Sequence, residues 1–357
     1  MKVLQCKGSF RSVGREVGRA SRTAIPALHD RVVAYLLEYT TVGSLRQMSE
    51  IADRYAQSTQ KYWSPAFEYL YGLAEGAGVP FDTIALIAFS EEIASEFEAA
   101  PSKCSTFVVW TSSGHILGHN EDYEPHYFGE MILLDATFDG FGRVVGLTYP
   151  GMLPNLAGSL NAHGLAITNN SFWVAACPGY SKQAQHFRAS LLPDMDTAVQ
   201  ILSEQSIALS THYTVAHGPS YEAVSLEVSN PVRADGYVAL RQIERDELSA
   251  FCHTNHVLEL TLREPDPAVV AKNHSLDRLA KLKALPVARY PRTPEEMLDL
   301  LSVNDGVLHR TPAQNPTSVT LATVVIRPAT GEFLVRDADP NEVNRDHRFI
   351  VSKNPLN

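Results

Sequence analysis

The sequence predicts an α+β fold in which helices and antiparallel strands form separate layers. Apolar residues recur every three to four positions through much of residues 1 to 103, as amphipathic helices require. Short apolar and β-branched runs bounded by turn residues dominate residues 104 to 357 and predict strands. No GxGxxG or GxxxxGK motif occurs, so no nucleotide-binding parallel sheet is indicated. Strands that follow one another, with helices grouped between them, favour a layered α+β architecture.

The first 103 residues are predicted to be mainly helical. One amphipathic pattern starts near Gly14 and continues through Leu37, a second covers residues 45 to 62, and a third starts near Pro65. Asp82 is a suitable N-cap for a fourth helix. The acidic residues that follow are expected on a solvated face; they are Glu91, Glu92, Glu96 and Glu98.

The rest of the chain is predicted to consist of hairpins with helices grouped between them. The hairpins cover residues 131–138 with 144–149, 156–161 with 164–170, and 319–326 with 332–336. Further strands are predicted at 213–216, 223–228 and 237–240, and helices at 187–192, 196–205, 275–285 and 294–302. The clearest internal boundary lies between residues 103 and 104, where helical spacing gives way to strand patterns.

Composition narrows the class of protein. The chain has 357 residues, 45% of them hydrophobic and 20% charged, which is ordinary for a globular protein. A formal net charge of −10 argues against a general nucleic-acid or anionic-membrane surface. No apolar run is long enough to span a bilayer, and the first residues lack the apolar core of a signal peptide. We therefore expect a cytoplasmic protein with no nucleic-acid or membrane partner.

The four cysteines are scattered and form no CxxC pair, so neither a zinc knuckle nor a disulfide framework is predicted. Cys6, Cys177 and Cys252 are expected to be small hydrophobic residues, with Cys6 on an N-terminal strand. The thirteen histidines show no HExxH or other metal spacing. The sequence therefore predicts no metal and no cofactor.

Cys104 stands at the start of a predicted hairpin. The cysteine opens an apolar, β-branched run, and a turn at residues 112–114 leads into a second strand that ends at Asn120 and Asp122. The hairpin returns Asp122 towards the beginning of the first strand, beside Cys104. A thiol with a carboxylate next to it has the makings of a nucleophile and its orienting group.

Several motifs, taken in order, resemble the acyl-coenzyme A:6-aminopenicillanate acyltransferase family. They are the helical leader, Lys103-Cys104-Ser105-Thr106, Gly118-His119-Asn120-Glu121-Asp122 and His253-Thr254-Asn255-His256. The likeness covers nearly the whole chain. It implies a four-layer αββα sandwich and a self-processing N-terminal-nucleophile enzyme, the C45 type of cysteine peptidase.

The resemblance implies that the chain cuts itself between Lys103 and Cys104. Residues 1–103 would then be the leader, or α chain, and residues 104–357 the catalytic β chain of a heterodimer, which can oligomerise further. The new α-amine of Cys104, with an ordinary pKa of about 7.7, would be the general base for its own thiol. The thiol would attack an amide or thioester carbonyl and form an acyl-enzyme.

The resemblance also implies roles for other residues. Asp122 would orient the α-amine and Asn255 would donate to the oxyanion; the structural alternatives are a turn aspartate and a loop asparagine. Asn170, or its neighbour Asn169, would be a further polar group beside the thiol. Ser229 matches a position linked to processing, with a plain strand-end serine as the alternative. His119 stands where the related bile-salt hydrolase and acid ceramidase branches carry arginine, and is expected to be a core or surface histidine.

The predicted activity is hydrolysis or acyl transfer at a linear amide of a small acylated amine, amino acid or peptide-like substrate. Tyr123 and Phe172 are candidate substrate contacts, with core packing as the alternative. Transfer from acyl-CoA, as in the penicillin enzyme, is a second possibility for the same site. An unprocessed small-molecule binding protein is the alternative outside catalysis. A papain-like thiol hydrolase is disfavoured because the glutamine and histidine motifs of that class do not surround Cys104.

Overall fold

Two stacked β-sheets form the centre of the computed structural model, which describes residues 1–97, 104–172, 174–230, 232, 234, 236–261, 274–315 and 318–351. Within these residues, one sheet has eight strands in the order β1-β4-β5-β6-β7-β8-β9-β10 and the other has six in the order β11-β2-β3-β12-β13-β14. Neighbouring strands are antiparallel except for the parallel pair of β1 with β4.

The strands of the larger sheet are β1 (Lys2–Gly8), β4 (Ile132–Phe138), β5 (Gly142–Thr148), β6 (Ser159–Asn161), β7 (Leu165–Ser171), β8 (Thr211–His217), β9 (Glu222–Val228) and β10 (Val238–Gln242). Those of the smaller sheet are β2 (Ser105–Thr111), β3 (Gly114–Tyr123), β11 (Ala250–His253), β12 (Val319–Arg327), β13 (Glu332–Asp337) and β14 (Asp346–Ile350). The predicted hairpins are confirmed, while β14 has no counterpart among the predicted strands.

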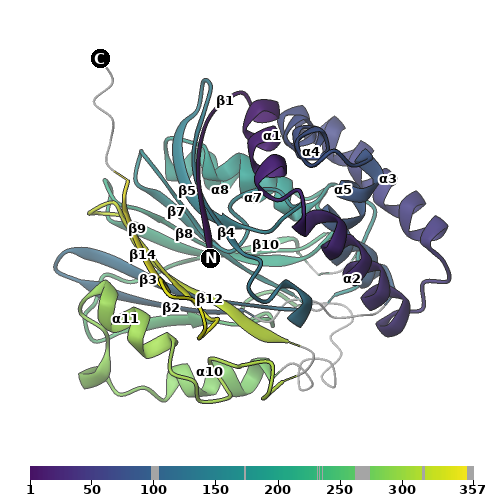
Figure 1. Cartoon of the computed structure of the whole chain (residues 1–357). Coiled ribbons are helices and arrows are strands. Elements are labelled where there is room, and N and C mark those ends of the chain that lie inside the picture. Colours follow the sequence, from purple (N-terminus) through teal and green to yellow (C-terminus); the bar gives the residue numbers. More distant parts are fainter. Residues whose placement is uncertain are drawn as a thin grey trace.

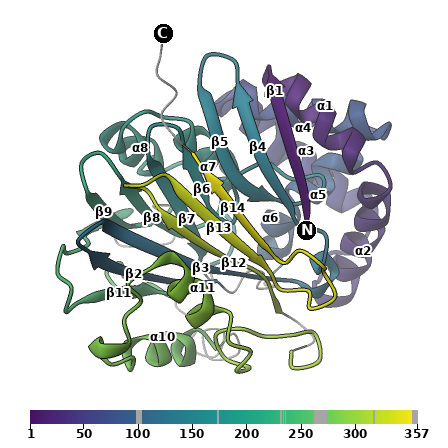
Figure 2. The same ribbon diagram turned by 60° about the vertical axis from the view of Figure 1, so that its left-hand side comes forward.

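Helices cover both outer faces of the sheet pair. They are α1 (Phe10–Ala20), α2 (Ala24–Tyr39), α3 (Leu45–Tyr62), α4 (Ser64–Ala77), α5 (Phe81–Ala88), α6 (Ser90–Glu96), α7 (Lys182–Ser190), α8 (Met195–Leu202), α10 (Ser275–Lys283) and α11 (Pro294–Leu301). Helices α1, α7 and α8 pack on the larger sheet, and α10 and α11 pack on the smaller one (Figures 1 and 2). The expected α+β fold with αββα layers is confirmed.

The N-terminal helical region is joined to the rest of the fold through both packing and hydrogen bonds. Strand β1 pairs with β4 from Lys2 opposite Ile132 to Gly8 opposite Phe138. Helices α1 and α4 approach closely because glycines face backbone at their crossing: a Cβ on Gly76 would lie 2.0 Å from a backbone oxygen of α1. The first part of the chain therefore contributes one edge strand and much of one helical layer.

Three details of the predicted helices are corrected. The first long pattern is two helices, α1 and α2, because the chain turns between them. Helix α5 has Pro80 as its N-cap, and Asp82 lies in the first turn. Glu91 and Glu92 are 4% and 0% exposed, so they do not form a solvated face. Helix α6 is buried against the body of the protein, where Glu91 pairs with Lys182 and Glu96 with Arg54. Neither carboxylate oxygen of Glu92 has a hydrogen-bond partner among the described residues.

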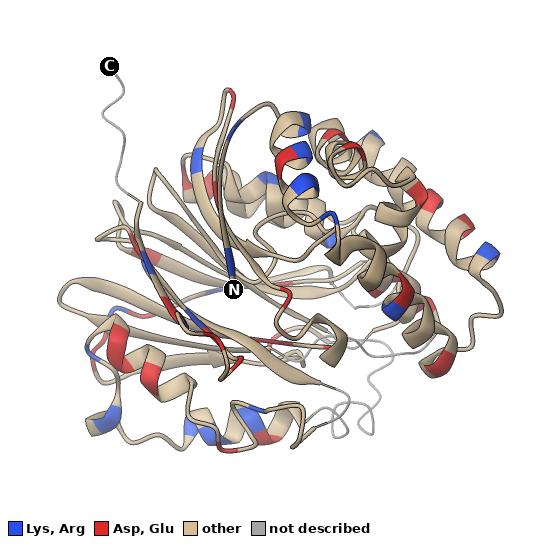
Figure 3. Cartoon of the chain, viewed as in Figure 1, with Lys and Arg blue, Asp and Glu red and all other residues tan. Residues whose placement is uncertain are grey.

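Charged residues of both signs are interspersed along the outer helices α1 to α4 (Figure 3). This mixture is typical of a solvated protein surface. Within the described ranges, none of the helices combines the length and apolarity that a membrane crossing requires.

Candidate active site

A small cavity of about 30 Å³ lies in front of Cys104. We call it the Cys104 cavity. It is lined by Glu91, Cys104, Glu121, Tyr123, Tyr149, Met152, Leu156, Asn169, Ser171, Lys182, Gln183, His186 and Tyr213. The walls come from helix α6 of the N-terminal region, from strands of both sheets and from helix α7. A space of this volume holds one or two water molecules, so side chains that line it must move before an organic ligand can enter.

Cys104 lies at the floor of this cavity, directly before β2, and is 2% exposed. The two-residue turn between Thr111 and Gly114 fixes the register of the hairpin, which pairs Ser105 with Asn120. One step further along, Cys104 stands opposite Glu121. The thiol donates a hydrogen bond to Glu121 Oε2 at 3.4 Å.

Burial and the neighbouring carboxylates of Glu121 and Asp122 raise the pKa of the Cys104 thiol well above its usual range. The thiol therefore holds its proton in this environment and needs a base to become a nucleophile.

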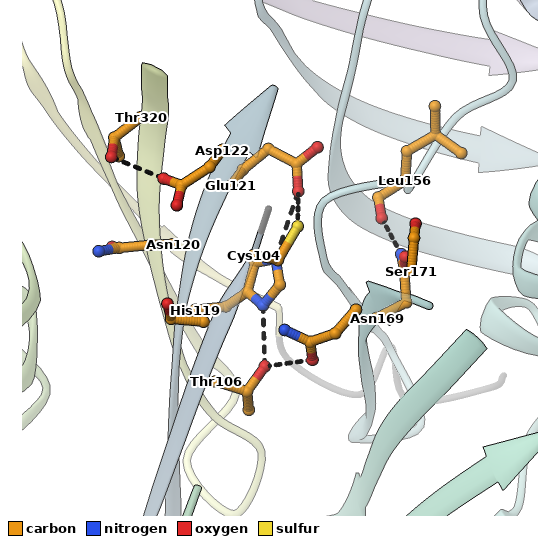
Figure 4. A network of polar contacts seen from close by, with 12 residues as sticks. Cys104, Thr106, His119, Asn120, Glu121, Asp122, Leu156, Asn169, Ser171 and Thr320 are labelled. Carbon is orange, nitrogen blue, oxygen red and sulfur yellow. Dashed lines mark hydrogen bonds and ion pairs between the residues drawn. The ribbon is translucent and has the colours of Figure 1, made fainter. Parts of the chain in front are cut away.

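A hydrogen-bond network extends from the thiol into the space between the sheets (Figure 4). Glu121 Oε2 lies 3.3 Å from His119 Nε2, and His119 Nδ1 lies 3.0 Å from Thr106 Oγ1. Thr106 Oγ1 donates to Asn170 Oδ1 at 2.9 Å, which links β2 to β7. His119 is fully buried, so it is a core histidine and not a surface one.

The Asp122 side chain points to the opposite side of β3 from Glu121, as alternation along a strand requires (Figure 4). Its carboxylate accepts hydrogen bonds from Arg310 Nη2 and Thr320 Oγ1, both at 2.6 Å. Asp122 is 0% exposed and Arg310 is 2% exposed, so this is a buried ion pair. The Asp122 carboxylate also contributes to the raised pKa of the Cys104 thiol. The hairpin thus brings Asp122 beside Cys104, as predicted, but its carboxylate is also paired with Arg310.

Asn255 is joined to Cys104 through the buried guanidinium of Arg278. Arg278 Nη1 donates to the carbonyl oxygen of Cys104 and, at 2.9 Å, to Ser105 Oγ, while Nη2 donates to Asn255 Oδ1 at 2.6 Å. Asn255 Nδ2 donates to the carbonyl oxygen of Ser171 at 2.9 Å. Burial lowers the pKa of Arg278 to about 10, which leaves it charged at neutral pH.

The segment around Asn255 is anchored from two directions. His253 Nε2 lies 2.9 Å from Glu227 Oε1, and the backbone N–H of Leu258 donates to the same oxygen at 2.6 Å. Ser275, at the start of α10, accepts from the backbone N–H of Asn255 through its hydroxyl at 2.8 Å. These contacts fix the Asn255 side chain against Arg278.

A buried ion pair forms the opposite wall of the cavity. Lys182 Nζ donates to Glu91 Oε1 at 2.6 Å and also to Ser171 Oγ. Ser171 Oγ in turn donates to Glu91 Oε1 at 2.7 Å. Glu91 belongs to α6 and Lys182 to α7, so the N-terminal region supplies one of the charged groups that face Cys104.

Some of the remaining predicted residues line the cavity and others do not. Tyr123 lines it, and Asn169 lines it where Asn170 does not. Asn170 is fully buried behind the network and accepts from Thr106 and His212. Ser229 Oγ pairs with Ser210 Oγ at 2.7 Å, away from the lining residues, and Phe172 packs in a small cluster of its own with Val174, Ala234 and Val257. Lys103 lies outside the described residues.

Sequence reasoning missed several residues that surround the thiol. The sequence could have predicted the position of Glu121, because counting back from the two-residue turn pairs this residue with Cys104. Arg278 and Arg310 are far from Cys104 along the chain, and no local pattern marks an arginine that folds back onto a strand start. The Glu91–Lys182 pair was not predicted, because charged residues are usually exposed and both residues were expected at the surface or not singled out.

A family model and a curated relative name the same family. The family model of acyl-coenzyme A:6-aminopenicillanic acid acyltransferase matches residues 109–342, which is more than half of the chain. The chain is 23% identical over 260 residues to the acyl-coenzyme A:6-aminopenicillanic-acid-acyltransferase 40 kDa form of Emericella nidulans, covering 71% of this chain and 69% of that protein. It is 23% identical over 291 residues to the beta-alanyl-dopamine/carcinine hydrolase of Drosophila melanogaster, covering 74% of each.

Among solved structures, a variant of the conjugated bile acid hydrolase from Clostridium perfringens matches with a TM-score of 0.45 and 11% identity, over 70% of this chain and 93% of that one. The penicillin V acylase from Agrobacterium tumefaciens matches with a TM-score of 0.36 and 13% identity, over 66% and 83%. The family model begins at Val109, in the second half of β2, and covers β3 and the Asn255 segment but not Cys104. The expected resemblance to the family is confirmed. The chain belongs to the acyl-coenzyme A:6-aminopenicillanic acid acyltransferase family.

Proposed function

We propose that this protein is a self-processing amidohydrolase or acyltransferase that uses Cys104 as its nucleophile. Membership of the family supports an enzyme of the amide hydrolase and acyltransferase class. One observation carries the assignment to this site: the Cys104 sulfur lines a cavity, while Arg278 holds the carbonyl of the same residue. A thiol fixed at a cavity floor by its own backbone is placed to attack a bound carbonyl.

Processing would begin with attack of the Cys104 thiol on the carbonyl carbon of Lys103. The peptide nitrogen leaves as the α-amine of Cys104, the acyl group moves to sulfur, and water hydrolyses the thioester to a Lys103 carboxylate and a free thiol. The leader, residues 1–103, would stay with residues 104–357 as a heterodimer. The pairing of β1 with β4 supports this, because it does not depend on the cleaved bond.

Turnover would use the new α-amine of Cys104 as general base. A free α-amine has a pKa near neutrality and can take the proton that the buried thiol holds. The Asp122 carboxylate lies close enough to the thiol to raise its pKa, and would orient the α-ammonium group. Asn255 uses one amide hydrogen on Ser171, and its second amide hydrogen would donate to the oxyanion.

We propose a linear amide of a small acylated amine, amino acid or peptide-like compound as the substrate. One relative is named for the hydrolysis of beta-alanyl-dopamine and carcinine, and beta-alanyl-dopamine is an acylated amine of this class. The other is named for acyl transfer to 6-aminopenicillanic acid, whose free amine would be acylated to a linear amide. The cavity offers Tyr123 and Tyr149 as an apolar wall and the Lys182–Glu91 pair as a polar one. Acyl-CoA is a second acyl donor to test, because the family is named for it.

The first experiment tests self-cleavage. After purification of the full chain, denaturing electrophoresis and N-terminal sequencing should yield a second fragment that begins at Cys104. Cys104→Ala should remain one chain, and Cys252→Ala, which removes another buried cysteine, should be cut normally. Cleavage of the Cys104→Ala variant would refute the mechanism. A single uncut chain in the wild-type protein would favour an unprocessed binding protein.

The second experiment tests turnover. A panel of acylated amines, with and without acyl-CoA as donor, is screened for release or capture of the amine. Activity should be lost in Cys104→Ala and after alkylation of Cys104, and a covalent acyl group should be found on Cys104 by mass spectrometry. Activity that survives in Cys104→Ala would place the nucleophile elsewhere.

A further inference from the structure

Cys104 and Glu121, which line the Cys104 cavity, and His119, which is buried beside them, bring together three atoms that can bind a metal ion. Cys104 Sγ, His119 Nε2 and one Glu121 oxygen lie within 4.8 Å of one another, and all three residues are buried. Glu121 Oε2 is 3.4 Å from the sulfur and 3.3 Å from the imidazole nitrogen. Figure 4 shows the three groups converging from the start of β2 and from β3.

The two separations from Glu121 Oε2 fit a tetrahedral zinc site. Bond lengths of about 2.3 Å to sulfur and about 2.0–2.2 Å to nitrogen and oxygen place the ligand atoms about 3.3–3.6 Å apart at tetrahedral angles. A thiolate, an imidazole and a carboxylate form a set that Zn²⁺ takes readily, whereas Mg²⁺ and Ca²⁺ prefer oxygen ligands alone. Cys104 Sγ and His119 Nε2, which lie within 4.8 Å of each other, would complete the set at a separation of about 3.6 Å.

Two of the three groups, His119 and Glu121, are also held by a further partner. Thr106 donates its hydroxyl hydrogen to Asn170, so its oxygen can accept from His119 Nδ1–H and leave Nε2 with a lone pair for the metal. Tyr149 donates to the other Glu121 oxygen at 2.6 Å. Supporting hydrogen bonds of this kind fix metal ligands before the ion arrives.

We propose that Cys104, His119 and Glu121 form a Zn²⁺ site that reversibly blocks the nucleophile. The thiol gives up its proton to solvent and the sulfur lone pair binds the ion, so no oxidation or reduction takes place. The fourth position of the ion faces the cavity and is filled by water. A thiolate and a carboxylate balance the two positive charges. Binding of Zn²⁺ does not depend on the proposed turnover; only the inhibition does, because the bound sulfur cannot attack a carbonyl.

Metal binding is tested without substrate. Zn²⁺ is titrated into the full chain in competition with a chelating dye, and Co²⁺ is used as a spectroscopic substitute. We expect one ion per chain and a thiolate-to-cobalt charge-transfer band. Cys104→Ser should abolish the band, and His119→Ala and Glu121→Gln should each weaken Zn²⁺ binding at least about 100-fold. Circular dichroism and thermal melting show whether each variant folds.

Two control variants each remove a thiol or an imidazole that does not belong to the proposed set of Cys104, His119 and Glu121. Cys252→Ser removes a buried thiol, and His186→Gln removes another histidine of the same cavity. Both should bind Zn²⁺ and give the cobalt band as the wild type does. Absence of saturable binding, or binding that is equal in Cys104→Ser and wild type, would overturn the proposal.

Alkylation gives a readout at the sulfur itself. Saturating Zn²⁺ should slow iodoacetamide labelling of Cys104, measured by peptide mass mapping, and a chelator should restore it. The protection should weaken in folded Glu121→Gln. Labelling of Cys104 at an unchanged rate would overturn the site whatever the outcome of the amide-hydrolysis assays, because no substrate takes part.

Discussion

The Cys104 sulfur and the Glu121 carboxylate face each other across the β2–β3 hairpin, with Sγ 3.4 Å from Oε2. The next residue, Asp122, directs its carboxylate to the other side of the strand, where it meets Arg310. Two adjacent acids therefore serve different environments. One faces the cavity and the thiol, and the other faces the helical layer of α10 and α11.

Replacement of Asp122 by asparagine is expected to lower both stability and activity. The substitution leaves the Arg310 guanidinium buried without its counter-charge, which costs about 3–5 kcal/mol of unfolding free energy. Chemical denaturation measures this loss, and the amide-release assay measures activity.

The double variant Asp122→Asn, Arg310→Met separates the two effects. Removal of the unpaired charge should restore much of the stability, whereas activity should stay low if Asp122 orients the α-amine. Recovery of full activity in the double variant would assign Asp122 a structural role alone.

Arg278→Lys should slow both processing and turnover. Lysine keeps the charge but cannot reproduce the fork that binds the Cys104 carbonyl, Ser105 and Asn255 together. We expect the rate of fragment formation to fall at least about tenfold, with a stability loss of about 1–3 kcal/mol. The matched substitution Arg289→Lys, on the surface, should change neither quantity. Wild-type processing in folded Arg278→Lys would show that the fork is dispensable.

The Glu91–Lys182 pair should couple the N-terminal region to the cavity. Lys182→Met leaves Glu91 buried without its ammonium partner and should cost about 3–5 kcal/mol. The double variant Glu91→Gln, Lys182→Met should be more stable than either single variant, which a double-mutant cycle by urea denaturation checks. Arg46→Met breaks an exposed pair with Glu50 and should have little effect. Additive effects of the two cavity substitutions would contradict the coupling.

Glu92 should make the protein more stable in mild acid than in mild alkali. Burial, together with the neighbouring Glu91, raises the pKa of Glu92 from 4.5 to about 7. Between pH 4.5 and about 7, Glu92 therefore keeps its proton in the folded state but loses it in the unfolded state. The protonated side chain stabilises the folded protein fully below pH 4.5, and this stabilisation is lost as the pH rises through about 7. The loss amounts to about 3 kcal/mol.

Glu92→Gln should abolish this loss. The variant should melt well above the wild type at pH 8 and near it at pH 4, in thermal scans at constant ionic strength. Glu50→Gln, which changes an exposed acid, is the matched control. An equal difference between Glu92→Gln and wild type at both pH values would contradict the assignment.

The sequence by itself determined the layered α+β class, the helix and strand order, and the hairpin that begins at Cys104. These follow from local periodicity and turn chemistry, which act over a few residues. The ordered motifs around Cys104, Asp122 and Asn255 also identified the family, and the family model confirms it.

Only the tertiary structure decided which groups meet at the thiol. Arg278 and Arg310 reach the site from about 170 or more residues away, whereas the place of Glu121 opposite Cys104 follows from the local hairpin register. The acids of α6 look like a solvated face in sequence, yet Glu91 is buried against Lys182. Such pairs join residues that are distant along the chain. They become buried and paired only when the layers pack together, so local sequence patterns do not predict them.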